Sequence, residues 1–179
     1  LFITNRENET FENNSAEKRY DWPDYNTGTG LSNLLFSAEP VWRKKVHDKL
    51  GFFNPDLKIA GDYDFFLKIA HEFGAAHFRE TTGLFHARAE SLSGSSNKRN
   101  TIDEALAVLK KHRNEIPLEK VYPKLSEFSG DPVAEAAAHW DFANLCMLSP
   151  YNDFEKAIEL YQKAIKTPGL PSNILDQLV

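Results

Sequence analysis

The feature that most constrains the fold is a change in sequence character near residue 100. After this point signals for helix starts recur, and no strand pattern is visible. Residues 101–104 (Thr-Ile-Asp-Glu) form a capping box, in which two side chains satisfy free backbone N–H groups. Asp131 precedes a proline suited to the first helical position, and Asn152 or Asp153 can cap another helix. We therefore predict an α/β domain over residues 1–100 and an all-helical region over residues 101–179.

The first hundred residues predict a mixed domain with an incomplete sheet. Short apolar runs favour strands, and apolar residues at helical spacing after Asp62 favour a helix that stops at Gly74. Residues 5–30 are polar and irregular, which is typical of a long loop. Gly28-Thr29-Gly30 within it is interpreted as a flexible connection, because it lacks the rest of a phosphate-binding loop. The expected elements are strands over 1–4, 34–36, 76–81 and 83–87, helices from Ser37 to Gly51 and from Asp62 to Gly74, and a polar loop over 91–100.

The region after residue 100 predicts helices separated by proline and glycine. The first helix runs to about His112, two more follow Asp131 and Asn152 or Asp153, and a last short one starts near Ser172. The basic run over residues 110–113 suits a helix C-terminus, where positive charge complements the helix dipole. Contact with an anionic membrane surface is the alternative interpretation of this run. Cys146 lies in an apolar helical stretch and is expected to be a small core residue.

Composition excludes several classes of function. The net charge is −5, and neither part of the chain has the basic excess that phosphate-backbone binding needs, so we expect no nucleic-acid partner. A single cysteine excludes a disulfide within the chain and a cysteine-based zinc cluster. No apolar run has the length of a membrane span, and no secretory signal is visible. We expect a cytoplasmic protein, with peripheral membrane attachment left open, and a piece of a longer chain that starts in mid-strand.

Asp62 is the residue whose position most suggests chemistry. A turn rich in Gly, Asn and Pro delivers this carboxylate to the start of an apolar helix. Free backbone N–H groups and the positive end of the helix dipole fix and favour a carboxylate there, so it can accept a proton from an attacking hydroxyl. Gly61 is expected to allow a sharp turn before it. The alternative is that Asp62 only caps its own helix.

Two sequence blocks around Asp62 carry a resemblance. The first ends in Asp62 and a basic residue of the same helix, and the second has an aromatic, a basic stretch with His, and Ser-Leu-Ser. In this order and spacing the blocks resemble the family 2 glycosyltransferases of the GT-A type. The matching positions are Arg43-Lys44, Gly51-Phe52, Leu57, Gly61-Asp62, Asp64-Phe65, Lys68 and the segment from Phe85 to Ser93.

The resemblance implies a partial GT-A fold and an inverting sugar transfer from a nucleotide-sugar to an acceptor hydroxyl, as in the synthesis of cell-surface polysaccharides or glycoconjugates. By this resemblance Asp62 is the general base, and the substrate-binding residues are Tyr63, Asp64, His86, Arg88 and Arg99. Two departures matter. Gly61 replaces the family's usual Glu, and the half with the nucleotide site and its Asp-x-Asp metal motif is missing. We therefore expect no cofactor or metal in this piece, which alone is inactive, and Mg or Mn only in the full-length enzyme.

The helical region resembles a tetratricopeptide repeat. Trp140, Ala157, Tyr161, Ala164 and Pro168 look like its signature positions, although Ala143, Asn144 and Met147 depart from it. The alternative is an ordinary helical hairpin. Since one repeat buries its apolar face poorly, the resemblance implies packing on a protein partner, on neighbouring helices or in a homodimer. The rival function is therefore a non-enzymatic binding or scaffold module that uses this helical repeat.

Overall fold

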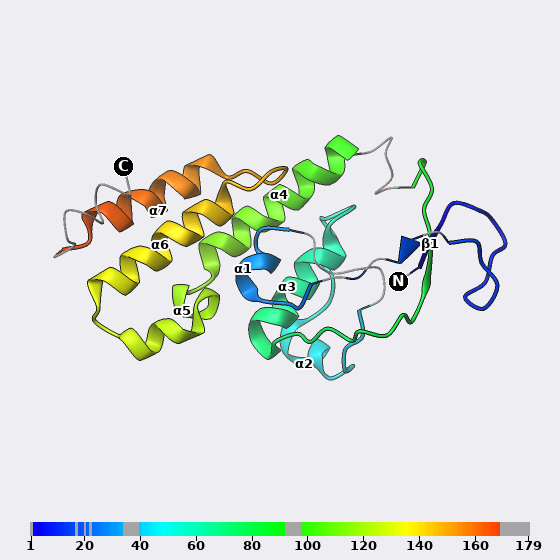
Figure 1. The fold of residues 1–179 in the computed structure, drawn as a ribbon, viewed down its shortest axis with the longest axis horizontal. Coiled ribbons are helices and arrows are strands. Elements are labelled where there is room, and N and C mark those ends of the chain that lie inside the picture. The colour runs from blue at the N-terminus through cyan, green and yellow to red at the C-terminus, as the bar shows by residue number, and fades with distance from the viewer. Residues whose placement is uncertain are drawn as a thin grey trace. The chain divides into compact units, whose positions relative to one another are not determined.

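The protein is described from a computed structural model, which covers residues 2–16, 18–19, 21, 23–33, 40–91 and 98–168. The chain divides into two compact units (Figure 1). The mixed unit comprises residues 1–25 and 34–104, and the helical unit comprises residues 26–33 and 105–179. Residues 26–33 thus belong with helices that follow them by about a hundred positions. No local sequence signal indicated this long-range assignment.

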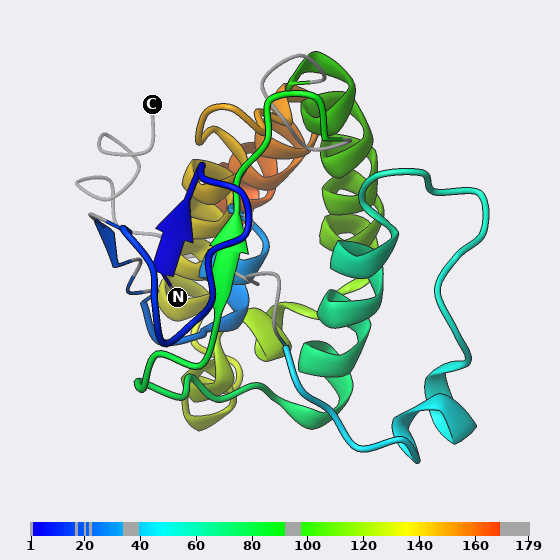
Figure 2. The same ribbon diagram turned by 90° about the vertical axis from the view of Figure 1, so that its right-hand side faces the viewer.

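The sheet of the mixed unit is small. Its described strands are β1 (Phe2–Thr4), β2 (Lys18–Arg19) and β3 (Leu84–His86), in the order β2-β1-β3. β1 runs antiparallel to β2 and parallel to β3, and Figure 2 shows β1 in blue beside β3 in green. The parallel register pairs Phe2 with Leu84 and Thr4 with His86. The predicted strands at 1–4 and 83–87 are confirmed in this shorter form, whereas β2 interrupts the predicted loop over 5–30.

The predicted strand over 76–81 is wrong. This segment has no regular secondary structure, and its polar groups are used by residues far away in sequence. Asp24 lies 3.5 Å from His77 Nδ1 and 2.6 Å from Arg79 Nη2, while Arg19 donates from Nη2 to the carbonyl oxygen of Arg79. The segment is therefore held by side-chain contacts and not by pairing with a neighbouring strand.

Two helices complete the mixed unit. α2 (Val46–Leu50) is much shorter than predicted, since residues 40–43 are not helical, and α3 (Gly61–Phe73) matches its prediction. Both end at a glycine with positive φ, 73° at Gly51 and 79° at Gly74, a conformation that glycine adopts without steric cost. A small core joins the two helices. It contains Val46, Phe65 and Phe66, with Trp42, Leu50 and Ile69 packed against them.

The helical unit is built from α1 (Thr27–Gly30), α4 (Lys98–Glu115), α5 (Leu118–Val121), the 3-10 helix η2 (Pro123–Phe128), α6 (Pro132–Cys146) and α7 (Phe154–Lys166). The first turns of α4 belong to the mixed unit. α4 begins three residues before Thr101 and continues beyond His112, so the predicted capping box is wrong. The predicted caps of α6 and α7 are confirmed: Asp131 accepts from the N–H groups of Val133 and Ala134, and Asp153 from that of Lys156.

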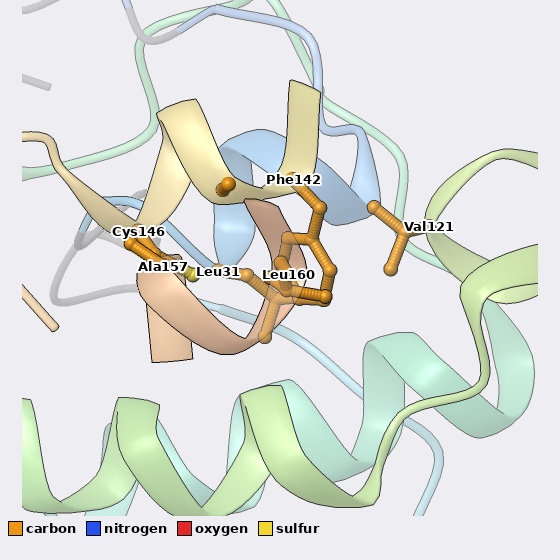
Figure 3. Close-up of a cluster of buried hydrophobic side chains, with 7 residues drawn as sticks. Leu31, Val121, Phe142, Cys146, Ala157 and Leu160 are labelled. Carbon is orange, nitrogen blue, oxygen red and sulfur yellow. The ribbon is translucent and has the colours of Figure 1, made fainter. Parts of the chain in front are cut away.

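α6 and α7 form a hairpin whose inner face is the core of the helical unit (Figures 1 and 3). Small buried residues such as Ala143 and Ala157 let the two helices approach closely, and the Trp140 and Tyr161 rings meet edge to face at 5.2 Å. Cys146 is fully buried, as predicted, and burial raises the pKa of its thiol to about 11. The buried cluster in Figure 3 comprises Leu31, Val121, Phe142, Ala143, Cys146, Ala157 and Leu160.

The interpretation of Gly28-Thr29-Gly30 as a flexible connection is wrong. These residues form α1, which Asn26 caps by accepting from the N–H of Thr29 at 2.8 Å. Gly28 is buried, and a Cβ atom there would come within 3.0 Å of Leu145 Cδ1. Glycine is therefore used for close packing of α1 against α6, which explains why residues 26–33 belong to the helical unit.

The predicted position of the basic run over residues 110–113 at a helix C-terminus is confirmed, because His112 and Arg113 lie in the last turn of α4. What the sequence did not indicate is that Arg113 is fully buried. Its Nε donates to the carbonyl oxygen of Leu31 at 2.9 Å and its Nη1 to that of Tyr151 at 3.0 Å. Its Nη1 also lies 3.8 Å from Asp153 Oδ2. One guanidinium thus ties α1, α4 and the loop before α7 together.

At the coarse level, the structure agrees with a small mixed unit and a separate helical region, and helices predominate. Among the described residues, no helix is both long and apolar enough to cross a membrane. Some predictions fall outside the described residues: the strand over 34–36, the cap at Ser37, the middle of the loop over 91–100 and the short helix from Ser172.

Candidate functional site

The loop that leads into α3 is held from a distance by Glu104. This side chain, on α4, accepts hydrogen bonds from the backbone N–H of Lys58 at 2.6 Å and of Ile59 at 3.0 Å. Within the loop, Asn54 accepts from the N–H groups of Asp56 and Leu57. These bonds fix the last residues before the helix. The sequence assigned Glu104 to a capping box, and its true partners lie 46 and 45 positions away, beyond the reach of local patterns.

Asp62 stands in the first turn of α3 with an exposed side chain. Its Oδ1 accepts from the backbone N–H of Tyr63 at 2.7 Å, which orients the carboxylate. The second oxygen, Oδ2, has no hydrogen bond to any described residue. A carboxylate in this turn is favoured by the positive end of the dipole of a 13-residue helix. This arrangement suits a general base, because Oδ1 is held by a hydrogen bond while Oδ2 is available to accept a proton.

Gly61 does not play the role expected of it. It is the first residue of α3 and does not have positive φ. A Cβ atom built on it would meet Leu57 Cβ at 3.6 Å and the carbonyl oxygen of Asn54 at 3.7 Å, which are ordinary contacts. The prediction that a sharp turn requires glycine here is therefore wrong. The backbone at this position therefore does not require glycine.

Tyr63 and Asp64 point into the mixed unit. Tyr63 is 4% exposed and Asp64 is 1% exposed. Asp64 Oδ2 lies 2.5 Å from Lys68 Nζ, one turn along the helix. The two residues adjoin Asp62 in sequence, but in this structure their side chains are buried, whereas that of Asp62 is exposed. Lys68, the basic residue of the sequence block, thus serves as the partner of a buried carboxylate.

The other predicted binding residues come from separate elements. His86 is half-buried at the end of β3, Arg88 is exposed just after it, and Arg99 is 94% exposed in the first turn of α4. Arg99 lies 3.9 Å from Asp103 of its own helix. Among the described residues, no hydrogen bond or ion pair connects any of these three side chains to Asp62, so of the predicted set only the sequence neighbours 62–64 lie together.

A stack of rings behind α3 was missed by sequence reasoning. His47 lies between Phe52, at 4.8 Å and 17°, and Phe65 of α3, at 5.0 Å and 9°. Its Nε2 accepts from Trp42 Nε1 at 3.1 Å, so Nδ1 carries the proton and donates to the carbonyl oxygen of Gly51 at 2.8 Å. Aromatic spacing in the sequence hinted at a core, but nothing local placed His47 between two phenylalanines.

The described part of the chain contains no group of three or more His, Cys, Asp or Glu side chains placed to hold an ion. The one Asp-x-Asp sequence, Asp62-Tyr63-Asp64, does not fit one either, because Asp64 is buried against Lys68 while Asp62 is exposed.

Comparison with known proteins adds no assignment. No family model, no curated protein and no solved structure gave a significant match to this chain.

Proposed function

We propose that this chain is the acceptor-side part of an inverting glycosyltransferase of the family 2 type, and that Asp62 is its general base. The observation that carries the proposal is the exposed Asp62 carboxylate, oriented by the N–H of Tyr63 at the start of α3. The loop before it is fixed by Glu104, and the helix beneath it is held by the ring stack on Phe65. A preorganised base of this kind needs no rearrangement when the acceptor arrives.

In the proposed reaction, Asp62 takes the proton of an acceptor hydroxyl as the oxygen attacks the anomeric carbon of the donor sugar. The bond between that carbon and the nucleoside diphosphate breaks, and its electron pair leaves on the phosphate oxygen. Because the hydroxyl oxygen attacks the face opposite to the leaving group, the configuration inverts. Lys68 holds Asp64 as an ion pair, which leaves Asp62 as the base. His86, Arg88 and Arg99 remain proposed contacts to phosphate or acceptor groups, while Tyr63 and Asp64 are assigned to support of the base.

The test is the pair Asp62→Asn and Asp56→Asn in the intact protein, assayed for transfer from a panel of UDP- and GDP-sugars. Asp56 is an exposed carboxylate of the loop that leads into α3, so it controls for charge. Asparagine cannot accept the proton, and we expect kcat to fall by about 10²–10⁴-fold for Asp62→Asn and to stay near normal for Asp56→Asn. Near-normal turnover in Asp62→Asn would remove Asp62 from this role.

A binding module is the second candidate function, and the α6–α7 hairpin favours it. A groove of ≈ 610 Å³ between the helices is lined by Glu135 and His139 of α6 and by Glu159, Gln162, Lys163, Lys166 and Thr167 of the α7 side. Phe154 and Ile158 of α7 are also exposed by 58% and 57%. Two results together would favour this function. The intact protein would form a concentration-dependent oligomer that Ile158→Lys dissociates, and it would show no detectable sugar transfer.

A further inference from the structure

The segment over residues 40–58 has a charge opposite to that of the whole protein. It contains five basic residues, Arg43, Lys44, Lys45, Lys49 and Lys58, and two acidic ones, Asp48 and Asp56, so its formal charge is +3 in a chain of −5. The segment runs into and out of α2 within the mixed unit. We call it the basic aromatic segment. The rest of the protein is acidic and repels an anionic partner, whereas this segment attracts one.

Most of these cations are uncommitted. Arg43, Lys44, Lys45 and Lys58 are exposed, and none of their charged groups makes an ion pair or hydrogen bond with another described residue. Lys49 differs, because it pairs with Glu72 and lies 5.5 Å from the centre of the Phe73 ring. Since exposed ion pairs add little to stability, these four cations are not needed for the fold and are available to an external partner.

The same segment exposes large apolar side chains. Val41 is 97% exposed, Phe52 77% and Phe53 46%. Phe52 stacks on His47, and Phe53 packs against Trp42 and Phe65 with ring centres at 6.4 Å and 5.0 Å. The rings are therefore anchored on their inner sides while their outer sides meet water. Exposed apolar groups that are held rigidly lose little entropy on binding, so they favour an interaction site.

We propose that the basic aromatic segment docks on the surface of an anionic lipid bilayer. Aromatic and aliphatic side chains at the interface gain by entering the acyl boundary, and each Lys or Arg near the surface gains from the negative headgroups. We favour a membrane over a nucleic acid because of Val41. Bases of a single strand stack on aromatic rings such as Phe52, but they do not stack on an aliphatic side chain. The basic run over residues 110–113 is not a second such surface, because His112 and Arg113 are buried.

This inference does not depend on the proposed transfer reaction. It places the mixed unit on a membrane surface whether or not Asp62 acts as a base. Surface docking does not require a membrane-spanning helix, and none of the described helices is long and apolar enough to be one. The contact would be reversible, since a few side chains reach only the headgroup and upper acyl region.

The experiment measures co-sedimentation of the full chain with vesicles of phosphatidylcholine containing about 30 mol% phosphatidylglycerol, against vesicles of phosphatidylcholine alone. We expect binding to the anionic vesicles only, and its loss as salt rises from about 0.1 M to about 1 M, where the Debye length shrinks from about 10 Å to about 3 Å. Lys44→Glu with Lys45→Glu should weaken binding by about tenfold or more.

Matched variants distinguish a specific surface from net charge. Lys124→Glu with Lys166→Glu changes the net charge by the same amount at exposed positions of the helical unit, and it should leave vesicle binding nearly unchanged. Val41→Ser with Phe52→Ser should weaken binding at fixed charge, whereas Phe128→Ser with Phe154→Ser, at 53% and 58% exposure, should not. Circular dichroism confirms that each variant is folded.

Three results would overturn the proposal. Equal binding to neutral vesicles would remove the charge argument, and equal loss in both lysine pairs would show that only net charge matters. Absence of binding to anionic vesicles, together with salt-sensitive binding to single-stranded oligonucleotides that Phe52→Ser abolishes, would instead assign the segment to nucleic acid.

Discussion

The two units of this protein are held together in different ways. In the helical unit, fully buried side chains from α6, α7 and residues 26–33 form one continuous cluster around Phe142. In the mixed unit, the described strands have two or three residues, the ring stack around His47 is small, and phenylalanines such as Phe52 and Phe78 are exposed. The helical unit is therefore stabilised mainly by a packed core, whereas the mixed unit presents more of its aromatic side chains at the surface.

A second difference concerns how distant parts of each unit are joined. Arg113 joins three segments of the helical unit from inside its core, where water does not compete. Glu104 joins two segments of the mixed unit through backbone N–H groups near the surface. Removing a buried charge leaves its partners unsatisfied in a medium of low polarity, whereas water replaces most of a surface contact. The comparison therefore predicts unequal costs for the two losses.

The largest effect is expected for Arg113→Met. Methionine keeps the aliphatic volume but leaves the carbonyl oxygens of Leu31 and Tyr151 without this donor. It also removes one of the two cations beside the buried Asp153, leaving Lys110 at 3.7 Å. We expect the free energy of unfolding of the helical unit to fall by ~3 kcal/mol. Urea denaturation followed by the NMR signal of the Trp140 indole measures it.

Arg99→Met is the control, because Arg99 is 94% exposed and lies 3.9 Å from its one described ionic partner, Asp103. Its cost should stay within ~0.5 kcal/mol. If Arg113→Met cost no more than Arg99→Met, the buried guanidinium would not be what unites α1 with the helices that follow it.

A smaller effect is expected for Glu104→Ala. The change removes the acceptor for the N–H groups of Lys58 and Ile59, so the loop before Asp62 should loosen. We expect a loss of ~1–2 kcal/mol in the mixed unit and faster amide exchange at Lys58 and Ile59. Glu115→Ala, an exposed glutamate at the other end of α4, should change neither quantity. Unchanged exchange in Glu104→Ala would show that the loop is ordered by other contacts.

Prediction from sequence succeeded where a signal and its consequence lie within a few residues. The caps at Asp131 and Asp153, the helix ending at Gly74 and the burial of Cys146 depend on neighbours along the chain, and all were confirmed. It failed where the partner is remote. Glu104 fits a capping box by spacing, yet its oxygens accept from backbone groups on another segment. Arg113 does lie at a helix end, as predicted, but its burial against the carbonyl oxygens of Leu31 and Tyr151 was missed.

The candidate site divides along the same line. Asp62 in the first turn of α3 follows from local pattern, because turn residues and helical spacing fix where the helix begins. The burial of Asp64 is harder to predict. The spacing of four residues to Lys68 predicts an ion pair along the helix, but it does not show which face of the helix is buried. The distances from Asp62 to His86, Arg88 and Arg99 depend on how strands and loops return in space, and no periodicity encodes that.

The smallest expected effect lies in the loop after β1 and depends on pH. Hydrogen bonds from Ser15 and then from Thr4 lower the pKa of Glu9 below its ordinary value of 4.5. A lowered pKa in the folded state means that the carboxylate stabilises the loop above pH 4.5, and that this contribution is lost as pH falls through the folded pKa. The Ser15 amide signal should therefore shift on acidification below pH 4.5, before global unfolding. Glu9→Gln should abolish this step, because glutamine does not titrate, while Glu12→Gln in the same loop should retain it. A step that persists in Glu9→Gln would mean that another carboxyl group orders this loop, and that even the short bonds near the surface of the mixed unit contribute little to its local order.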